Sequence, residues 1–579
     1  MRWTSDKVVA AVRAGQSFDG ESLEALDLRG RDLRGANFAA ARITGCDLSD
    51  ANLTGANLKQ ALISSVRLRG SLLDCVDLTE AVMSMVDASQ IAAKEAKLVG
   101  LRAPGLLLSG ADLQGADLTG ALLIGAALEK VNLSKATLVE TKLDATKLEG
   151  ADFSDSKMER VSFAKASARG ARFDRASITK AVFAAADFSE TTFDGARIEE
   201  AAFTMTDLRG VKLPKHMVRC VLDGAKIKTD LQGADLSGSE LPDLDLSGAD
   251  LEGANLSFTV LRGANLRGAC LRGANLERSI LDGCDLRDAD LSGARLGGAI
   301  LDHANLSGQD LSGLEMLLGD FAGANLSGAN LRGAKLELVS LRDANLEGAD
   351  LTRANFDSVN LAGAKLAGAK LDGLVFRKVD FGGVDLDGVS LRGLSLPLSS
   401  FTGAKLAGAD FSTCDLSCAD FSNADLTGAK FGGAKLDKAC FKAAILQKAD
   451  LGDVDARGAF FGEADLRQAR LVESRLRYAT FSGATLDDAN LTKADLRDTI
   501  CTGMTAERAK LGGVKMAFAD LSHAIVRDAE FGGADLTHAN LHELVADRAT
   551  LAGATLTGAR QTDLERRDAE RFVPKHATK

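Results

Sequence analysis

The sequence predicts an all-β solenoid, and three observations carry that prediction. A large apolar residue returns at every fifth position over nearly the whole chain, as in the run from Leu251 to Leu276. A small residue, usually Ala, stands two positions before it, and Gly often stands two positions after it. The chain holds 59 Gly, 5 Pro and only 5% aromatic residues, a composition that favours a repeat protein over ordinary globular domains.

The first residues, 1–22, do not follow this repeat. Thr4 or Ser5 is placed to cap a short helix through Val8, Val9 and Val12 that ends near Gly15. Because the end of a solenoid must be covered, we expect 1–22 to be an N-terminal capping segment.

Two blocks of the repeat follow, at 23–218 and 231–558. The central apolar positions keep one phase from Leu28 to Val218 and another from Leu231 to Leu556. Residues 219–230 therefore form a phase-breaking loop or kink, or a join between two solenoids, next to the restricting Pro214. Between Met83 and Ala103 several central positions are only Ala, which predicts thin coils without a break in the repeat.

The last segment, 559–579, loses the repeat again. Thr562 followed by Glu565 resembles a capping box, and Leu564, Phe572 and Val573 give a weak apolar face. We expect a C-terminal capping helix followed by a tail.

A five-residue period matches neither a helix nor a long strand. Each unit has a short extended piece, with the small and the large apolar residue on one side, and then two residues that suit a turn. Such units bend the chain repeatedly in one sense. Phe residues recur at intervals of twenty, which predicts four units per coil and rings stacked in internal ladders; they are Phe381, Phe401, Phe421, Phe441, Phe461 and Phe481 in the second block, and Phe153, Phe173 and Phe193 in the first.

The unit A(D/N)LxG, as in Ala249-Asp250-Leu251-Glu252-Gly253 and Ala324-Asn325-Leu326-Ser327-Gly328, resembles the motif of the pentapeptide repeat family. That resemblance implies a right-handed quadrilateral β-helix with four repeats per coil. Roughly 105 units would make about 26 coils, and a stack about 125 Å long at a strand spacing of about 4.8 Å if it is continuous.

Charge and reactive residues argue against catalysis. The net charge of −11 is mild and the charges are interspersed, so direct binding of nucleic acid is not expected. Nothing outside the repeats is large enough for a catalytic domain, and we expect no enzyme activity and no cofactor. His523, His538 and His542 fall on adjacent coils, but no carboxylate or Cys completes a metal set in the sequence, so they are interpreted as surface residues.

Location follows from what the sequence lacks. The nine Cys are irregularly spaced and odd in number, which favours free thiols in a reducing compartment. The first residues show no apolar signal run, and no run of 18 apolar residues exists, so a cytoplasmic protein without a membrane span is expected. Export by a route without a signal stays open.

The departures from the repeat are the candidate partner site. Outward positions should be polar, and seven in the second block are not: Phe258, Val260, Ile280, Ile300, Leu317, Leu318 and Leu338. Val260, Ile280 and Ile300 are twenty apart and would form an exposed column, while Phe258, Leu318 and Leu338 would lie at the adjoining corner. Exposed apolar patches mark partner sites, although simple tolerance, or cover by a loop or the tail, are the alternatives.

Three functions fit these features. The first is a non-enzymatic protein-binding or scaffold protein that presents a long rigid surface, with a second copy, bound through the strip or the terminal helix, as one candidate partner. The second rests on the resemblance: smaller members of the family mimic duplex DNA and regulate DNA gyrase. The third, an accessory or effector of a bacterial type VI secretion system, rests on the occurrence of long pentapeptide repeat proteins beside such systems.

Overall fold

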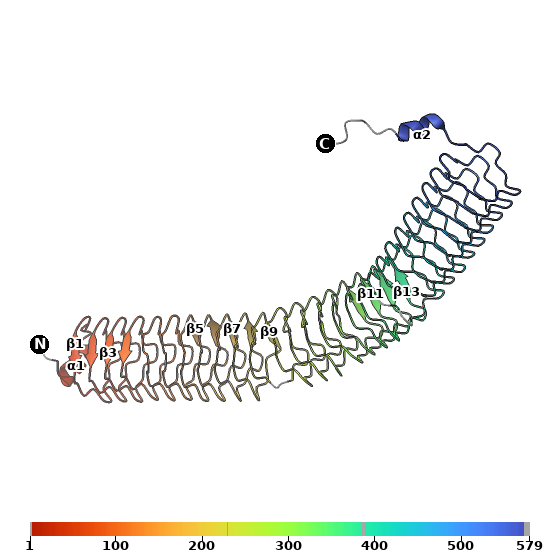
Figure 1. The fold of residues 1–579 in the computed structure, drawn as a ribbon. Coiled ribbons are helices and arrows are strands. Elements are labelled where there is room, and N and C mark those ends of the chain that lie inside the picture. Colours follow the sequence, from red (N-terminus) through yellow and green to blue (C-terminus); the bar gives the residue numbers. More distant parts are fainter. Residues whose placement is uncertain (1–2, 228–229, 385, 387–388, 572–579) are drawn as a thin grey trace. The chain divides into compact units, whose positions relative to one another are not determined.

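The computed structural model describes residues 3–227, 230–384, 386 and 389–571. Over these residues the chain forms a parallel β-solenoid with a short helix near each end (Figure 1). By their internal contacts the residues divide into two compact units, unit 1 (1–295) and unit 2 (296–579). The shift of phase lies inside unit 1, and the division into two repeat blocks at that shift stays a prediction.

The regular elements are few and short because most pairing between coils involves a single residue of each unit. In unit 1 they are α1 (Ser5–Arg13), β1 (Ser22–Glu24), β2 (Arg42–Thr44), β3 (Leu62–Ser64), β4 (Val82–Ser84), β5 (Thr137–Val139), β6 (Lys157–Glu159), β7 (Ser177–Thr179), β8 (Arg197–Glu199) and β9 (His216–Val218). In unit 2 they are β10 (Glu315–Leu317), β11 (Lys335–Glu337), β12 (Asn355–Asp357), β13 (Val375–Arg377) and α2 (Leu564–Glu570).

The register confirms four units per coil. Ile43 of β2 pairs with Ile63 of β3, and Leu336 of β11 pairs with Phe356 of β12, each with a partner twenty residues further along. All pairs between named strands are parallel, which is what stacked coils of one hand require. The predicted fold class, an all-β solenoid of pentapeptide units, is confirmed.

The core consists of the small and the large apolar residue of every unit. Ala254 and Leu256 are both fully buried, and this alternation repeats through both units. The predicted Phe ladders are present: in unit 1, Phe173 stacks on Phe153 and on Phe193 with ring centroids 4.8 Å and 5.0 Å apart. In unit 2, Phe421 stacks on Phe401 and on Phe441 at 4.8 Å and 5.0 Å.

The shift of phase consists of two separate losses of one residue. After Leu213 the next buried central residue is Met217, so Val218, which the sequence predicts as a core position, is only half-buried. Leu222 keeps the new phase, and Leu231 begins the last one. Coils across this region pair at a spacing of nineteen residues, as between Arg197 and His216. The first loss falls in the turn between Leu213 and Met217, where a shorter connection leaves both central residues buried.

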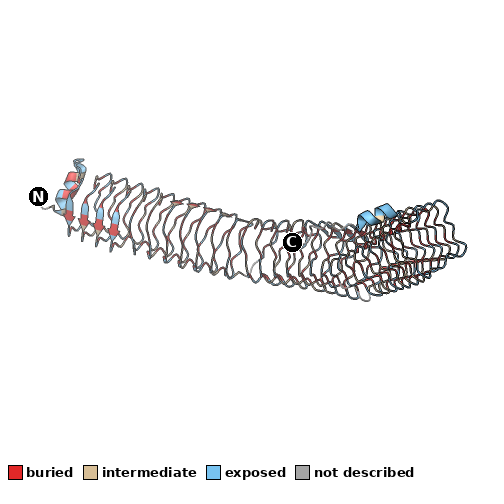
Figure 2. Ribbon diagram, turned by 45° about the horizontal axis from the view of Figure 1, so that its top comes forward, coloured by how far each residue is buried: buried red, intermediate tan, exposed pale blue. Residues whose placement is uncertain are grey.

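The N-terminal end is closed as expected, and the repeat begins earlier than the sequence predicts. Val8, Val9 and Ala11 of α1 are buried (Figure 2). Phe18, which the sequence assigns to the capping segment, already occupies a buried core position, and its ring lies 5.0 Å from that of Phe38 and 4.9 Å from that of Trp3.

The C-terminal helix differs from its prediction. Asp563, and not Thr562, is the N-cap of α2, and its carboxylate accepts from the N–H groups of Glu565 and Arg566. The Thr562 hydroxyl instead accepts from the N–H of Glu543, so no capping box forms. Leu564 is exposed and α2 buries none of its own residues, while Phe572 and Val573 lie outside the described residues (Figure 2).

Candidate functional site

At nearly every corner of the described residues, two positions after the central residue of a unit, the backbone is left-handed. Gly holds many of these corners with φ near 65°, because it has no Cβ to clash there. Among the described residues of unit 2, the large apolar side chains with positive φ all stand at equivalent positions, separated by multiples of twenty residues; they are Leu318, Leu338, Leu398, Tyr478 and Phe518, with φ of 57°, 55°, 61°, 65° and 62°.

These five residues belong to one corner column of the solenoid, in which polar residues also stand; those are Ser358, Lys378, Lys438, Asp498 and His538. The N–H of Leu318 donates to the carbonyl of Glu337, and the N–H of Leu338 to that of Asp357, so each corner lies on the next coil's corner. The same bonds continue through Tyr478 to Phe518. The side chains are 49% to 61% exposed, so the fold does not use them as core.

The adjoining face column adds three apolar residues. Ile300, Phe460 and Ile500 stand at outward positions of one continuous series of paired residues and are 38%, 39% and 48% exposed. Sequence reasoning found Ile300 and missed Phe460 and Ile500, although their spacing from it by multiples of twenty is readable. We call these two sets of residues in unit 2 the apolar stripe: Ile300, Leu318, Leu338, Leu398, Phe460, Tyr478, Ile500 and Phe518. Leu317, the last residue of β10, is 43% exposed but lies outside both columns.

The remaining candidates lie in unit 1. Phe258 is 58% exposed with φ of 59°, and the guanidinium of Arg278 lies 5.6 Å from its ring centroid. Val260 pairs with Ile280 on the next coil, as a column requires, and both side chains are half-buried. Side chains stacked on adjacent coils cover one another, since coils stand only about 4.8 Å apart.

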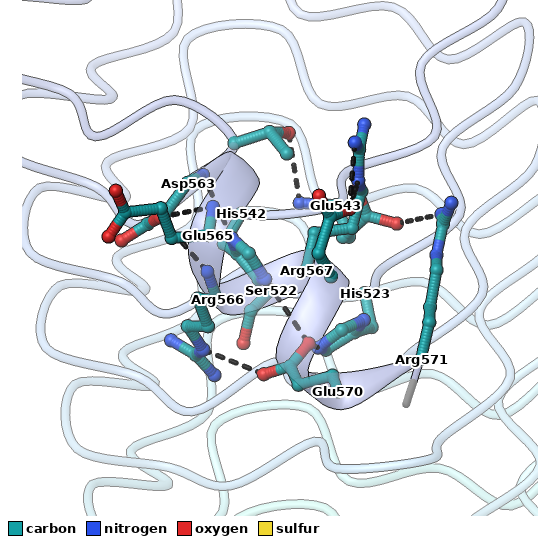
Figure 3. A network of polar contacts seen from close by, with 12 residues as sticks. Ser522, His523, His542, Glu543, Asp563, Glu565, Arg566, Arg567, Glu570 and Arg571 are labelled. Atoms are coloured by element: carbon teal, nitrogen blue, oxygen red, sulfur yellow. Dashed lines mark hydrogen bonds and ion pairs between the residues drawn. The ribbon is translucent and has the colours of Figure 1, made fainter. Parts of the chain in front are cut away.

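The histidine prediction is partly wrong. The rings of His523 and His542 do approach, with centroids 5.4 Å apart, but His538 stacks on Phe518 of the corner column at 5.0 Å. Glu570 of α2 completes the group that the sequence left without a carboxylate (Figure 3). Its Oε2 lies 3.2 Å from Nε2 of His542 and 3.2 Å from Nε2 of His523.

This triad has the ligand types of a divalent metal site, and one ligand atom from each residue lies within 4.8 Å of the others. Its hydrogen bonds do not suit a metal. The N–H of Asp563 donates to Nδ1 of His542 at 3.1 Å, so the neutral ring carries its proton on Nε2, the atom that a metal would need. Arg566 also holds Glu570 at 2.7 Å, and its side-chain hydrogen bond lowers the pKa of that carboxyl. We therefore interpret the triad as the anchor of α2.

The perturbed titratable groups elsewhere are structural. Burial raises the pKa of Cys220 to about 11 and that of Cys284 to about 12, which makes both thiols poor nucleophiles. A hydrogen bond from Ser292 holds the pKa of Asp290 at about 2, within a turn that repeats along the chain. A cavity of about 610 Å³ borders Asp230, Asp245 and Asp250, and it adjoins 228–229, which lie outside the described residues. Among the described residues, no helix is long and apolar enough to cross a membrane.

Comparison with known proteins agrees with this geometry. The family model for pentapeptide repeats matches 22–60, 107–213, 229–308, 320–393, 399–513 and 515–544. No curated protein sequence matches the chain.

Several solved structures are similar in part. HetL, a pentapeptide repeat protein involved in heterocyst differentiation regulation in Nostoc sp. strain PCC 7120, is 22% identical over 52% of this chain and 97% of its own, with a TM-score of 0.18. Trypsin-treated QnrB1, a plasmid-mediated fluoroquinolone resistance protein, is 22% identical over 36% and 91%, with a TM-score of 0.20. A pentapeptide repeat protein of the Arabidopsis thaliana thylakoid lumen is 32% identical over 20% and 68%, with a TM-score of 0.12. The repeat unit, the twenty-residue coil and the family match together show that this chain belongs to the pentapeptide repeat family.

Proposed function

We propose that this protein is a non-enzymatic binding protein whose apolar stripe is the contact site for a protein partner. The observation that carries the proposal is the segregation of large apolar side chains. Among the described residues of unit 2, every large apolar residue with a left-handed backbone stands in the same corner column, while the other three corner columns hold Gly, Ala or polar residues.

The energetics support a role outside folding. A left-handed backbone costs a residue with a Cβ about 1 kcal/mol or more relative to Gly. Exposed Leu, Tyr or Phe side chains return little of that cost through packing, because about half of their surface stays in water. Strained, exposed apolar residues gathered in one column are best explained by a partner that covers them.

The composition of the stripe also suits a protein interface. Tyr478 and Phe518 are of the aromatic type enriched at the centres of interfaces, and the guanidinium of Arg477 lies 4.6 Å from the Tyr478 ring centroid. A Cβ at Gly462 would lie 2.5 Å from the tip of Phe460, so that Gly lets the ring lie against the flat face. We include Phe258, Val260 and Ile280 of unit 1 as a second, smaller contact group.

The charge pattern favours protein binding over mimicry of DNA. A protein that mimics DNA needs continuous rows of acidic side chains. The outward-facing rows of unit 2 instead carry both acidic and basic side chains. Asp350 lies between Lys370 and Arg332 at 3.7 Å from each, and Asp455 lies 2.8 Å from Arg457 and 3.7 Å from Arg475. No feature of the described residues favours a role as an accessory or effector of a type VI secretion system.

The test is affinity purification of the tagged chain from its native cell, followed by mass spectrometry. We expect the double variant Leu318→Lys and Leu338→Lys to lose the partner that the unchanged chain recovers. The pair Tyr478→Lys and Phe518→Lys tests the other end of the stripe.

The matched control is Asp343→Lys. Asp343 is also exposed and left-handed, with φ of 55°, but it stands at another corner of the same coils. It should leave recovery unchanged. Equal recovery by both stripe variants and the control would show that the stripe is not the contact site.

A further inference from the structure

One outward face of unit 1 brings a thiol together with two carboxylates. Asp250 and Cys270 stand at the same position of successive coils and pair with each other. Glu252 lies in the turn that follows Asp250. One ligand atom from each of these three residues lies within 4.8 Å of the other two, and all three residues are half-buried. We call Asp250, Glu252 and Cys270 the thiol–carboxylate cluster.

Neighbouring groups orient both carboxylates of the cluster. The N–H of Glu252 donates to Oδ1 of Asp250 at 3.0 Å, and the side-chain amide of Gln232 donates to Oε2 of Glu252 at 3.2 Å. Hydrogen bonds of this kind fix the direction of a carboxylate that binds a metal. The second oxygen of each carboxylate takes part in neither bond, so each side chain keeps an acceptor for a ligand.

The cluster lacks the cation that balances an equivalent turn elsewhere in unit 1. Arg29 stands two positions after Asp27 and pairs with it at 2.7 Å. In the cluster the corresponding position holds a second carboxylate, Glu252. Among the described residues neither Asp250 nor Glu252 forms an ion pair. Two carboxylates this close repel each other, and a bound cation removes that repulsion.

Arg272, two positions after Cys270, does not supply this cation. Its Nη2 lies 2.9 Å from Oδ2 of Asp290, on the coil that follows Cys270. That ion pair also engages Asp290, which stacks on the other side of Cys270. The thiol therefore has a carboxylate already held by Arg on one side, and the unbalanced pair Asp250 and Glu252 on the other.

We propose that the thiol–carboxylate cluster binds Zn²⁺ through one sulfur and two carboxylate oxygens, with water completing a tetrahedral shell. Zn²⁺ accepts thiolate sulfur at about 2.3 Å and carboxylate oxygen at about 2.0–2.2 Å, whereas Mg²⁺ and Ca²⁺ prefer oxygen alone. Such a shell places ligand atoms roughly 3.5 Å apart, a separation that rotation of these outward side chains supplies. Cys270 releases its proton to solvent on binding, so affinity rises with pH. This inference does not rest on the apolar stripe.

The test is metal binding by the full chain after reduction and removal of metal with a chelator. Titration with Zn²⁺ against a chromophoric competitor should show a dissociation constant of about 1 μM. Co²⁺ in place of Zn²⁺ should give a sulfur-to-cobalt charge-transfer band, which marks a thiolate ligand. Cys270→Ser should abolish the band and weaken Zn²⁺ binding at least about tenfold. Glu252→Gln should weaken binding and keep the band.

The matched control is Cys440→Ser. Cys440 is also half-buried and pairs with an Asp on the preceding coil, Asp420, but Ser422 stands where the cluster has Glu252. This variant should keep both the cobalt band and the affinity for Zn²⁺. An excess of Ca²⁺ should not displace Zn²⁺ from the unchanged chain. Circular dichroism checks that every variant folds.

The outcomes separate this cluster from the other group of metal-ligand types, the triad at α2. Binding without a cobalt–sulfur band that disappears in His542→Ala would assign the metal to the triad and overturn the proposal. It would also be overturned by an absence of Zn²⁺ binding, by unchanged binding in Cys270→Ser, or by a band that is lost in Cys440→Ser.

Discussion

At the scale of single residues, the informative positions are those where the repeat tolerates a side chain that it does not need. A corner demands a left-handed backbone, and the sequence meets that demand with Gly or with polar residues at most corners. Leu318 is neither Gly nor polar, and its side chain is 60% exposed. Sequence reasoning identified Leu318 because the period shows which positions point outward. The left-handed backbone at the same position is known only from the structure.

Leu318→Asn should therefore leave the fold intact or stabilise it by up to about 1 kcal/mol, since Asn adopts the left-handed region more readily than Leu. Chemical denaturation followed by circular dichroism measures the change. The matched substitution Leu336→Asn, at a core position of unit 2 that is 1% exposed, should lower the free energy of unfolding by several kcal/mol. A loss at Leu318 comparable to that at Leu336 would mean that Leu318 is part of the core.

At the scale of elements, neighbouring coils stabilise one another more than any coil stabilises itself. The strands are only three residues long, so each gains its stability from stacking on the next. The spacing of Phe residues revealed this stacking in advance, because identical side chains at identical positions stack well. The anchor of α2 was not predictable from the sequence. The segment that brings Glu570 to His523 and His542 does not follow the five-residue repeat, so the period cannot place it.

Phe421→Ala should destabilise unit 2 by about 3–5 kcal/mol, because it removes a fully buried ring that stacks on both neighbouring rings. Phe421→Leu should cost only about 1 kcal/mol, since Leu fills most central positions. The free energy of unfolding from denaturant titration separates the two. Equal losses would contradict the ladder as a source of stability.

Glu570→Ala should release α2 while the solenoid stays folded. A seven-residue helix is not stable alone, and Glu570 supplies its contacts with both His523 and His542. Trypsin should then cut after Arg566 and Arg567 several-fold faster, as mass spectrometry would show. Glu565→Ala, which removes a carboxylate of α2 that faces away from the triad, is the control. Identical cutting of all three chains would exclude the triad as the anchor.

At the scale of the whole molecule, one small unit repeated many times decides both fold and pH response. The period, the coil and the core were readable from the sequence because every coil repeats them. The nature of the phase shift was not: two losses of one residue, after Leu213 and before Leu231, look in the sequence like one irregular stretch. The repeat shows which side chains are exposed, but it does not identify the partner that would bind them.

Acid should weaken the solenoid between about pH 4 and pH 2. A side-chain hydrogen bond from Arg467 holds the pKa of Asp465 at about 2, and Ser292 does the same for Asp290, both below the usual value near 4. A carboxyl with a lowered pKa in the folded state contributes stability above its unfolded pKa, and loses it as the pH falls through the folded value. Thermal unfolding temperatures should fall over that range and stay nearly level between pH 5 and 8. A flat profile down to pH 2 would contradict these values.

The closed N-terminal end has one more consequence, which concerns optical measurements. Trp3, the only Trp of the chain, packs on Phe18 and donates its ring N–H to Glu21 at 3.2 Å. The only Tyr, Tyr478, stands on the apolar stripe of unit 2. Tryptophan emission therefore reports the opening of the first coil alone, while tyrosine emission reports events on the stripe. A single natural fluorophore in each unit lets an observer follow fraying at one end and partner binding on the other unit in the same cuvette, without any label.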